Sequence, residues 1–141
     1  MKKILFLHGF ASSGHNGTAI MLREQLYADG VTVIAPDIPV MPAEAMPFLR
    51  RLVADEAPDL IVTASMGGLY GEQLRGIPRI LINPAFTMAK NLTFGGMGHR
   101  EFFNKRQDGA KEFKVDRAMI DQFRDIEKQL FKGITAEEKA L

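Results

Sequence analysis

The stretch of sequence that decides the fold is Val62-Thr63-Ala64-Ser65-Met66-Gly67-Gly68. An apolar run over residues 60–63 leads into it, and a helical pattern over residues 66–75 follows it. A serine at such a junction lies on a sharp turn that exposes its hydroxyl above the edge of a sheet. The turn is crowded, and the alanine before the serine and the two glycines after it are small enough to fit. The stretch therefore predicts a strand, a tight turn and a helix.

Ser65 has two interpretations at this turn. As the nucleophile of a G-x-S-x-G type elbow, it would face the positive N-terminus of the following helix, which favours developing negative charge. Thr63 stands where that motif has its first glycine, and its branched side chain is expected to crowd the turn. In the other interpretation Ser65 only caps the helix. A nucleophile requires a strained backbone and an exposed hydroxyl, whereas a cap would leave the hydroxyl buried.

The first 84 residues alternate between strand and helix patterns. Continuous apolar runs, typical of strands covered on both faces, occupy residues 4–7, 31–35, 60–63 and 80–82. Amphipathic patterns over residues 19–26 and 45–53 predict helices between them. The order predicts a three-layer α/β domain with a parallel sheet of strand order 2-1-3-4 and right-handed crossovers.

A second motif, LHGFASSG at residues 7–14, follows the first strand. A His-Gly-x loop in this position commonly supplies one backbone N–H of an oxyanion hole, and the residue after the nucleophile, here Met66, supplies the other. The strand order places this loop beside Ser65, at a topological switch point. Without that chemistry the motif is only a turn that needs glycine for positive φ.

The same loop imitates the start of a phosphate-binding P-loop, because four residues separate Gly9 from Gly14. That motif continues with lysine and then serine or threonine, whereas His15 and Asn16 follow here. The cation for the phosphate and the hydroxyl for magnesium are both missing. The sequence therefore argues against nucleotide binding, and it implies no metal or organic cofactor.

The composition is that of a soluble protein. Of the 141 residues 46% are hydrophobic and 25% are charged, and the net charge is +1, which argues against a nucleic-acid partner bound through bulk charge. The chain has no cysteine, which excludes disulfides and thiolate metal sites. The N-terminal apolar run stops at His8, too short for a signal core or a membrane span. We therefore expect a cytoplasmic protein with no membrane partner.

The sequence changes character after Pro84. Residues 86–115 combine glycines with scattered Phe and Met, and we interpret them as loop and short helices that form a lid or insertion. Residues 119–131 have the spacing of an amphipathic helix, which Gly133 ends.

The last residues have the pattern of a helix start, with too few residues after it to complete a helix. Thr135 and Glu138 have the spacing of a capping box, which predicts the start of another helix, and the chain stops at Leu141. We therefore expect residues 1–141 to be a single domain that is C-terminally incomplete. The sheet would then stop at the strand over residues 80–82, whose unpaired edge is a template for homo-oligomer formation.

Four stretches in this order resemble a known family: FLHGFASS (6–13), APDIP (35–39), TASMGG (63–68) and LINPA (81–85). The set is similar to the YqiA/YcfP-like family of small bacterial α/β-hydrolases, described as esterases. The resemblance covers essentially the whole chain and is strongest over residues 1–86. It implies Ser65 as nucleophile and the backbone N–H groups of Phe10 and Met66 at the oxyanion hole. Family members continue with a further βαβ unit that holds the triad acid and base, so neither residue can be assigned here.

Ser65 needs a base within hydrogen-bond reach, and the chain has three histidines. His8 belongs to the oxyanion loop and is expected to pack or to bond to nearby backbone. His15 lies in the loop above the sheet and His99 in the lid, and none of the three has a persuasive claim. The aspartates are expected in a structural turn by the resemblance (Asp37) or in solvated loop and helix-start positions (Asp108 and Asp116).

The combined motifs predict a serine hydrolase of the esterase type that acts on a small carboxylic ester. Two alternatives stay open: a truncated hydrolase without activity, and a non-enzymatic interaction domain on the same scaffold. A covalent serine probe separates an enzyme from a binding domain.

Overall fold

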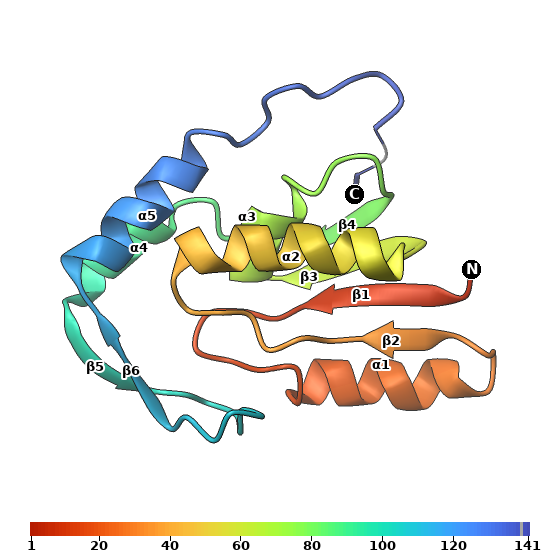
Figure 1. The fold of residues 1–141 in the computed structure, drawn as a ribbon, viewed down its shortest axis with the longest axis horizontal. Helices are drawn as coiled ribbons and strands as arrows, with labels where there is room; N and C mark the ends of the chain where they lie inside the picture. The colour runs from red at the N-terminus through yellow and green to blue at the C-terminus, as the bar shows by residue number, and fades with distance from the viewer. Residues whose placement is uncertain (139) are drawn as a thin grey trace.

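The computed structural model describes residues 1–138 and 140–141. Its centre is a parallel sheet in the strand order β2-β1-β3-β4 (Figure 1). The strands are β1 (Lys3–Leu7), β2 (Thr32–Ile34), β3 (Leu60–Ala64) and β4 (Arg79–Ile82). The connecting helices are α1 (Gly17–Tyr27), α2 (Pro42–Glu56) and α3 (Met66–Gly71). The predicted fold class and strand order are confirmed, although α3 is shorter than the helix predicted over residues 66–75.

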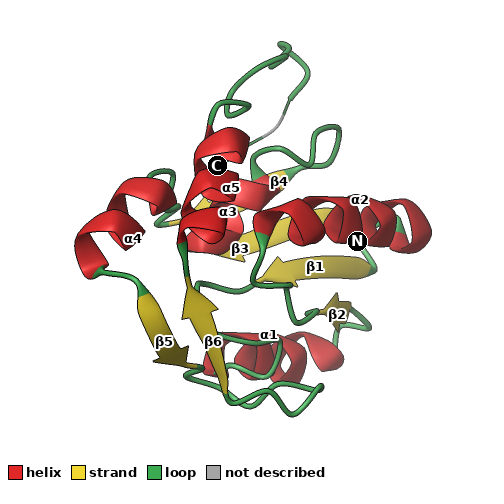
Figure 2. Ribbon diagram, turned by 60° about the vertical axis from the view of Figure 1, so that its left-hand side comes forward, coloured by secondary structure: helices red, strands yellow, loops and turns green. Residues whose placement is uncertain are grey.

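Helices cover both faces of the sheet (Figure 2). On one face Ile4 and Phe6 of β1 pack with Ala19 of α1. On the other face Leu5 and Leu7 belong to a larger core that includes residues of α2 and α3. Successive side chains of a strand point to opposite faces, so a strand between two helical layers must be apolar at every position. This is why the strands were visible as continuous apolar runs.

Two helices begin at capping side chains. Asn16 Oδ1 accepts a hydrogen bond from the Ala19 N–H at 2.9 Å at the start of α1. Asp116 Oδ1 accepts one from the Met119 N–H at 2.9 Å at the start of α5 (Arg117–Glu127). Each cap satisfies a backbone donor that the first turn of a helix leaves free. Asp116 is therefore a helix-start residue, as predicted.

The chain after β4 forms a second unit beside the carboxyl ends of the sheet strands (Figure 1). It consists of α4 (Met88–Gly95), a hairpin of β5 (Gly98–Glu101) and β6 (Glu112–Val115), and α5. The prediction of loop and short helices for this region was wrong about the hairpin. The four residues of β5 include no buried side chain, and only Phe113 and Val115 of β6 are buried, so no apolar run marked the strands. Over the described residues, no helix is long and apolar enough to cross a bilayer.

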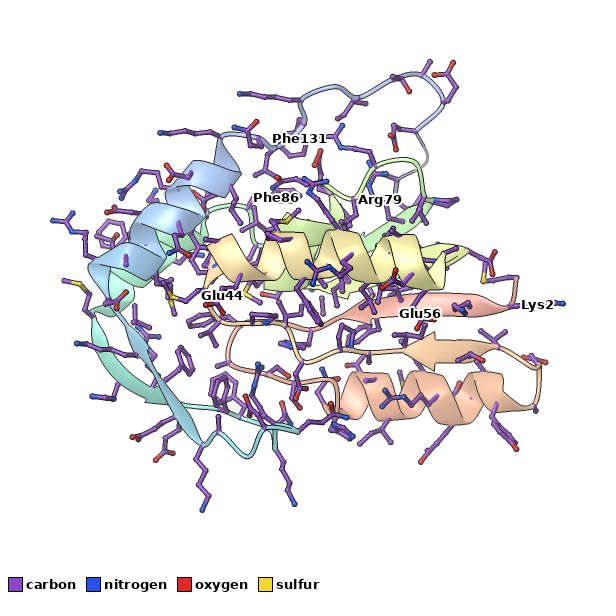
Figure 3. The ribbon with its side chains drawn as sticks, viewed as in Figure 1. Lys2, Glu44, Glu56, Arg79, Phe86 and Phe131 are labelled. Carbon is purple, nitrogen blue, oxygen red and sulfur yellow. The ribbon has the colours of Figure 1, made fainter. Side chains whose placement is uncertain are left out.

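The C-terminal residues also differ from the prediction. Thr135 opens a turn and not a helix, with the Glu138 N–H donating to its carbonyl at 3.2 Å. Arg79 of β4 (labelled in Figure 3) is buried. Its guanidinium pairs with the Glu138 carboxylate at 2.6 Å, because a buried cation requires a counter-charge. The Leu141 N–H donates to the Arg79 carbonyl at 2.9 Å, and the Leu141 carbonyl accepts from the Leu81 N–H at 2.7 Å. The end of the chain therefore covers part of the β4 edge that was expected to be open.

Candidate active site

Ser65 lies at the junction of β3 and α3 with φ 51° and ψ −116°, a strained conformation for a residue with a side chain. Its N–H donates to the Ile82 carbonyl at 3.0 Å, and its carbonyl accepts from the N–H groups of Gly68 and Ala85, each at 2.9 Å. These three bonds hold the backbone in that conformation. The residue is exposed, and within the described chain its hydroxyl does not cap α3. The expected strained turn is present, and the capping interpretation is not supported.

Glycines after Ser65 allow α3 to approach the sheet closely. A Cβ atom at Gly67 would collide with the carbonyl oxygen of Leu7 at the end of β1. A Cβ atom at Gly68 would lie 2.6 Å from Pro84 Cβ, well inside van der Waals contact. Both glycines are therefore required by backbone packing at the turn.

Thr63 does not crowd the turn as expected. Its side chain is fully buried under α3, where a Cβ atom at Gly71 would lie 2.5 Å from its methyl carbon. A Cβ atom at Gly68 would lie 3.2 Å from its hydroxyl oxygen. The absence of side chains at these two helix positions leaves the room that a branched residue needs. The glycines at positions 68 and 71 thus compensate for the branched residue that replaces the first glycine of the G-x-S-x-G pattern.

The loop after β1 lies against Ser65. Parallel pairing of Leu7 with Thr63 brings the carboxyl ends of β1 and β3 to the same edge of the sheet. A Cβ atom at Gly9 would lie 3.5 Å from Ser65 Cβ and 4.0 Å from its Oγ, so the glycine backbone is in close proximity to the hydroxyl. Phe10 follows this glycine. Within the described chain, the N–H groups of Phe10 and Met66 donate no hydrogen bond.

His8 is buried beneath this loop and is not available as a base. Its Nε2 accepts a hydrogen bond from the Ile38 N–H at 2.9 Å, which requires the proton to be on Nδ1. Nδ1 then donates to the Gly9 carbonyl at 2.7 Å. Burial lowers the pKa of His8 to about 4, so the ring is neutral at pH 7. The prediction that His8 packs and bonds to nearby backbone is confirmed.

The other two histidines are both exposed. His15 precedes α1, and His99 lies on β5 opposite Lys114. In the part of the chain that the structure describes, the Ser65 hydroxyl bonds to neither of them. The structure therefore brings the serine, Gly9 and the two N–H groups to one edge, and within the described residues no histidine is hydrogen-bonded to the Ser65 hydroxyl.

Arg106 is a buried residue that sequence reasoning missed. It comes from the loop between β5 and β6, and its guanidinium donates to the Ser12 carbonyl at 3.1 Å and to the Ile38 carbonyl at 2.9 Å. Its charge lies 4.6 Å from the centre of the Phe102 ring. One side chain thus joins the hairpin loop to the loops that follow β1 and β2. In sequence it is one of several basic residues in a polar segment, so its burial had no local signal.

Asp37 strengthens the same junction. Its carboxylate accepts from the N–H groups of Gly14 at 2.8 Å and Gln107 at 2.7 Å. Burial alone would raise its pKa, but these two N–H donors and the Arg106 charge together hold the pKa below its usual value. Asp37 is therefore a structural turn residue, as expected. Asp108, also as predicted, is a loop residue that bonds to the Ala110 N–H at 2.9 Å.

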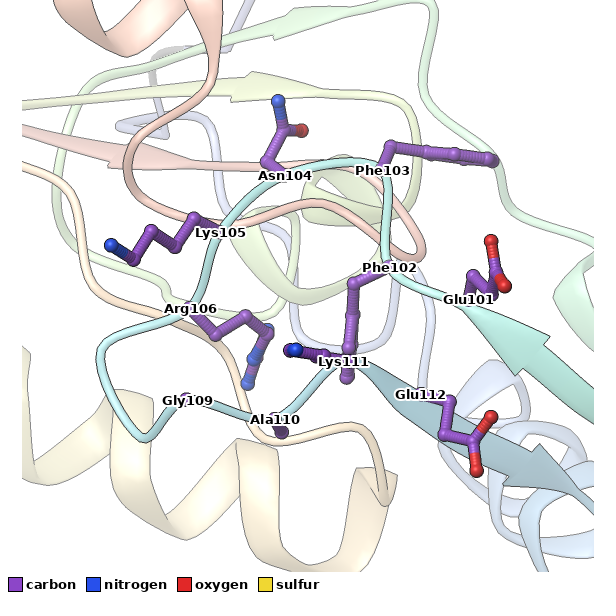
Figure 4. Close-up of a pocket in the computed structure, with 10 residues that line it drawn as sticks. All are labelled: Glu101, Phe102, Phe103, Asn104, Lys105, Arg106, Gly109, Ala110, Lys111 and Glu112. Carbon is purple, nitrogen blue, oxygen red and sulfur yellow. The ribbon is translucent and has the colours of Figure 1, made fainter.

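Residues of the hairpin loop line an open cavity of about 820 Å³ (Figure 4). Its walls carry both charges, with Lys105 and Lys111 among the basic residues and Glu101 and Glu112 among the acidic ones. Among the described residues, no three His, Asp or Glu side chains come together as metal ligands would.

The sheet order and the serine turn together define a protein of the α/β-hydrolase fold. More particularly, the sequence model of the uncharacterised protein family UPF0227 matches residues 3–132, and the chain belongs to that family. This confirms the family resemblance found in the sequence.

Two solved structures are similar to this chain. One is an Agrobacterium vitis S4 protein named "Putative hydrolase", with a TM-score of 0.65 over 89% of this chain at 15% identity. The other is the ydeN gene product of B. subtilis, with a TM-score of 0.51 over 57% of this chain at 20% identity. The chain spans 61% of the length of the first protein and 50% of the second. At these identities the likeness concerns the fold.

Proposed function

We propose that this chain is a serine hydrolase of the esterase type, with Ser65 as nucleophile and a small carboxylic ester as substrate. The observation that supports this best is the backbone at Ser65. A φ of 51° holds an exposed hydroxyl at the carboxyl end of β3, against Gly9 of the neighbouring loop. Strain of this kind persists only where the surrounding structure imposes it, and it is typical of nucleophile elbows.

In the proposed reaction Ser65 Oγ attacks the carbonyl carbon of the ester and forms a new C–O bond. The carbonyl electron pair moves onto oxygen, and we assign its stabilisation to the N–H groups of Phe10 and Met66. A donor of this kind contributes about 3 kcal/mol to the transition state. Collapse of the intermediate expels the alcohol, which takes up a proton, and water then releases the carboxylic acid from the acyl-enzyme.

The proton of the serine hydroxyl must pass to a base. His8 uses both ring nitrogens in hydrogen bonds, and within the described residues no histidine is hydrogen-bonded to the Ser65 hydroxyl. We therefore expect these 141 residues to turn over p-nitrophenyl acetate slowly. Triad enzymes without their base keep a rate about 10³–10⁴-fold above water through binding and the oxyanion hole. If turnover is fast, His15→Ala and His99→Ala are the first variants to test.

A fluorophosphonate probe tests the proposal directly. Serine Oγ attacks phosphorus, the P–F bond breaks, fluoride leaves, and the hydroxyl proton goes to buffer. Mass spectrometry is expected to find the label on Ser65 and not on Ser12 or Ser13 of the adjacent loop, and Ser65→Ala is expected to prevent labelling. A folded chain with no labelled serine would instead support one of the two alternatives, the inactive hydrolase or the interaction domain.

We also propose a cytoplasmic location and self-association through the β4 edge. The association rests on Ile82, an apolar side chain at the end of β4 that is 46% exposed. Light scattering is expected to show a dimer that Ile82→Lys weakens, and a monomer at all concentrations would contradict it.

A further inference from the structure

The tip of the hairpin is attached to the loop that contains Phe10. The Phe103 N–H donates to the Ala11 carbonyl at 2.8 Å, and the Ser12 hydroxyl donates to Asn104 Oδ1 at 2.8 Å. Together with Arg106, these bonds place the β5–β6 loop against the residues next to Gly9 and Ser65. The hairpin therefore forms one wall of the space beside the proposed oxyanion hole.

A cavity of about 390 Å³ lies at this contact. Its lining residues are Phe10, Ala11, Arg100, Glu101, Phe102 and Phe103. We propose that it binds an unbranched apolar group of the ester substrate, with Phe103 as the side chain that determines the preferred length. This inference rests on the proposed esterase function, because it places the cavity beside the reacting carbonyl.

The inner wall of the cavity is aromatic and rigid. The Phe10 ring packs edge-to-face on Phe113 with centroids 5.2 Å apart, and Phe102 lies 4.7 Å from the same ring. Phe113 is buried in the main core, so both rings are held in fixed positions. A wall of fixed aromatic rings favours alkyl groups, because it gains apolar contact without loss of side-chain freedom.

The outer wall is Phe103, whose side chain is 80% exposed although its backbone is fixed by the bond to Ala11. An alkyl chain in the cavity would remove part of this ring from water. The Arg100 guanidinium donates to the Gly96 carbonyl at 2.9 Å and is therefore engaged at the rim. The apolar surface, rather than this charge, is then the feature that selects the ligand.

Two isomeric amides test binding without depending on catalysis. N-methylhexanamide carries a five-carbon alkyl chain on the acyl side of the carbonyl, and its isomer N-pentylacetamide carries a five-carbon chain on the nitrogen. Binding is measured by NMR from the amide shifts of Ala11 and residue 103. We expect one isomer to bind more tightly than its short analogue N-methylacetamide, and we expect Phe103→Ala to weaken that isomer about tenfold. The favoured isomer identifies whether the cavity takes the acyl or the alcohol side.

Phe94→Ala is the matched control, because Phe94 is 79% exposed but lies on α4 and does not line the cavity. It is expected to leave both amide affinities unchanged. Equal loss of affinity in the two variants, or no chain-length preference in the unmodified protein, would overturn the inference. If the amides bind as expected but fluorophosphonate leaves Ser65 unlabelled, the cavity assignment stands and the esterase proposal fails.

Discussion

The sheet region, residues 1–85, and the loop between β5 and β6 are held in place by different forces. The sheet region depends on apolar strands covered on both faces and on glycines that allow α3 to approach β1. Phe113 and Val115 of β6 pack in the main core, but the β5–β6 loop is held by individual polar contacts, chiefly those of Arg106, Asp37 and the Phe103 N–H. The difference suggests a division of roles, in which the first region carries the proposed chemistry and the second selects the substrate.

The sharpest test of this division is Ser65→Ala. We expect it to abolish fluorophosphonate labelling, whereas the slow ester hydrolysis that remains without a base should change little, because binding and the oxyanion hole supply it. Neither region should unfold, because the exposed hydroxyl makes no structural bond within the described chain. Circular dichroism and thermal melting check this point. Fluorophosphonate labelling that persists in the variant would remove the proposed chemistry from the sheet region.

Gly67→Ala is expected to have the largest effect on stability. The new Cβ would collide with the Leu7 carbonyl oxygen and lie 2.9 Å from that of His8, and neither backbone group can move without distorting β1. We expect a loss of about 3 kcal/mol in urea unfolding. Gly17→Ala is the control, since a Cβ there meets open space and should change stability by less than about 1 kcal/mol. Equal effects would contradict the close approach.

His8 is expected to make the sheet region sensitive to mild acid. Its pKa is about 4 in the folded protein and 6.5 as the ordinary value, so the unfolded chain takes up a proton first as pH falls. The contribution of neutral His8 to the free energy of unfolding is complete above pH 6.5. It decreases by about 3 kcal/mol between pH 6.5 and 4 and levels off below pH 4.

His8→Gln, which keeps an acceptor for the Ile38 N–H, is expected to remove most of this dependence. His99→Gln, at an exposed position on β5, should leave it intact. Urea unfolding at pH 7, 5.5 and 4.5 measures all three proteins. A pH profile unchanged by His8→Gln would show that another group is responsible.

Arg106→Met should have the smallest effect and should act on the hairpin. It removes the donors to the carbonyls of Ser12 and Ile38, and leaving these acceptors unpaired costs about 2 kcal/mol. Amide hydrogen exchange is expected to accelerate at Phe103 and Gln107 more than in the sheet. The exposed Lys105→Met is the control. Uniform acceleration of exchange across the chain would show that the β5–β6 loop and the sheet open together and not independently.

The architecture of the sheet region could be predicted because its signals are local. A strand buried on both faces must be apolar at each position, and a serine between such a strand and a helix must lie on a tight turn. The hairpin gave no such signal, since β5 is Gly98-His99-Arg100-Glu101 and none of its side chains is buried. Thr63 was misjudged for a related reason. The room for its side chain exists because Gly71 of α3, eight residues later in the sequence, has no side chain where it packs on Thr63.

The sequence by itself determined the sheet order, the position of Ser65 at its edge and the loop of Gly9 beside it, because hydrophobic patterning and backbone sterics act over a few neighbouring residues. Only the tertiary structure decided that Glu138 pairs with Arg79 and does not open a helix, and that Arg106 joins the hairpin to the loops after β1 and β2. Both depend on burial of a charged side chain. The cost of removing a charge from water is set by whatever surrounds it after folding, which no local pattern contains.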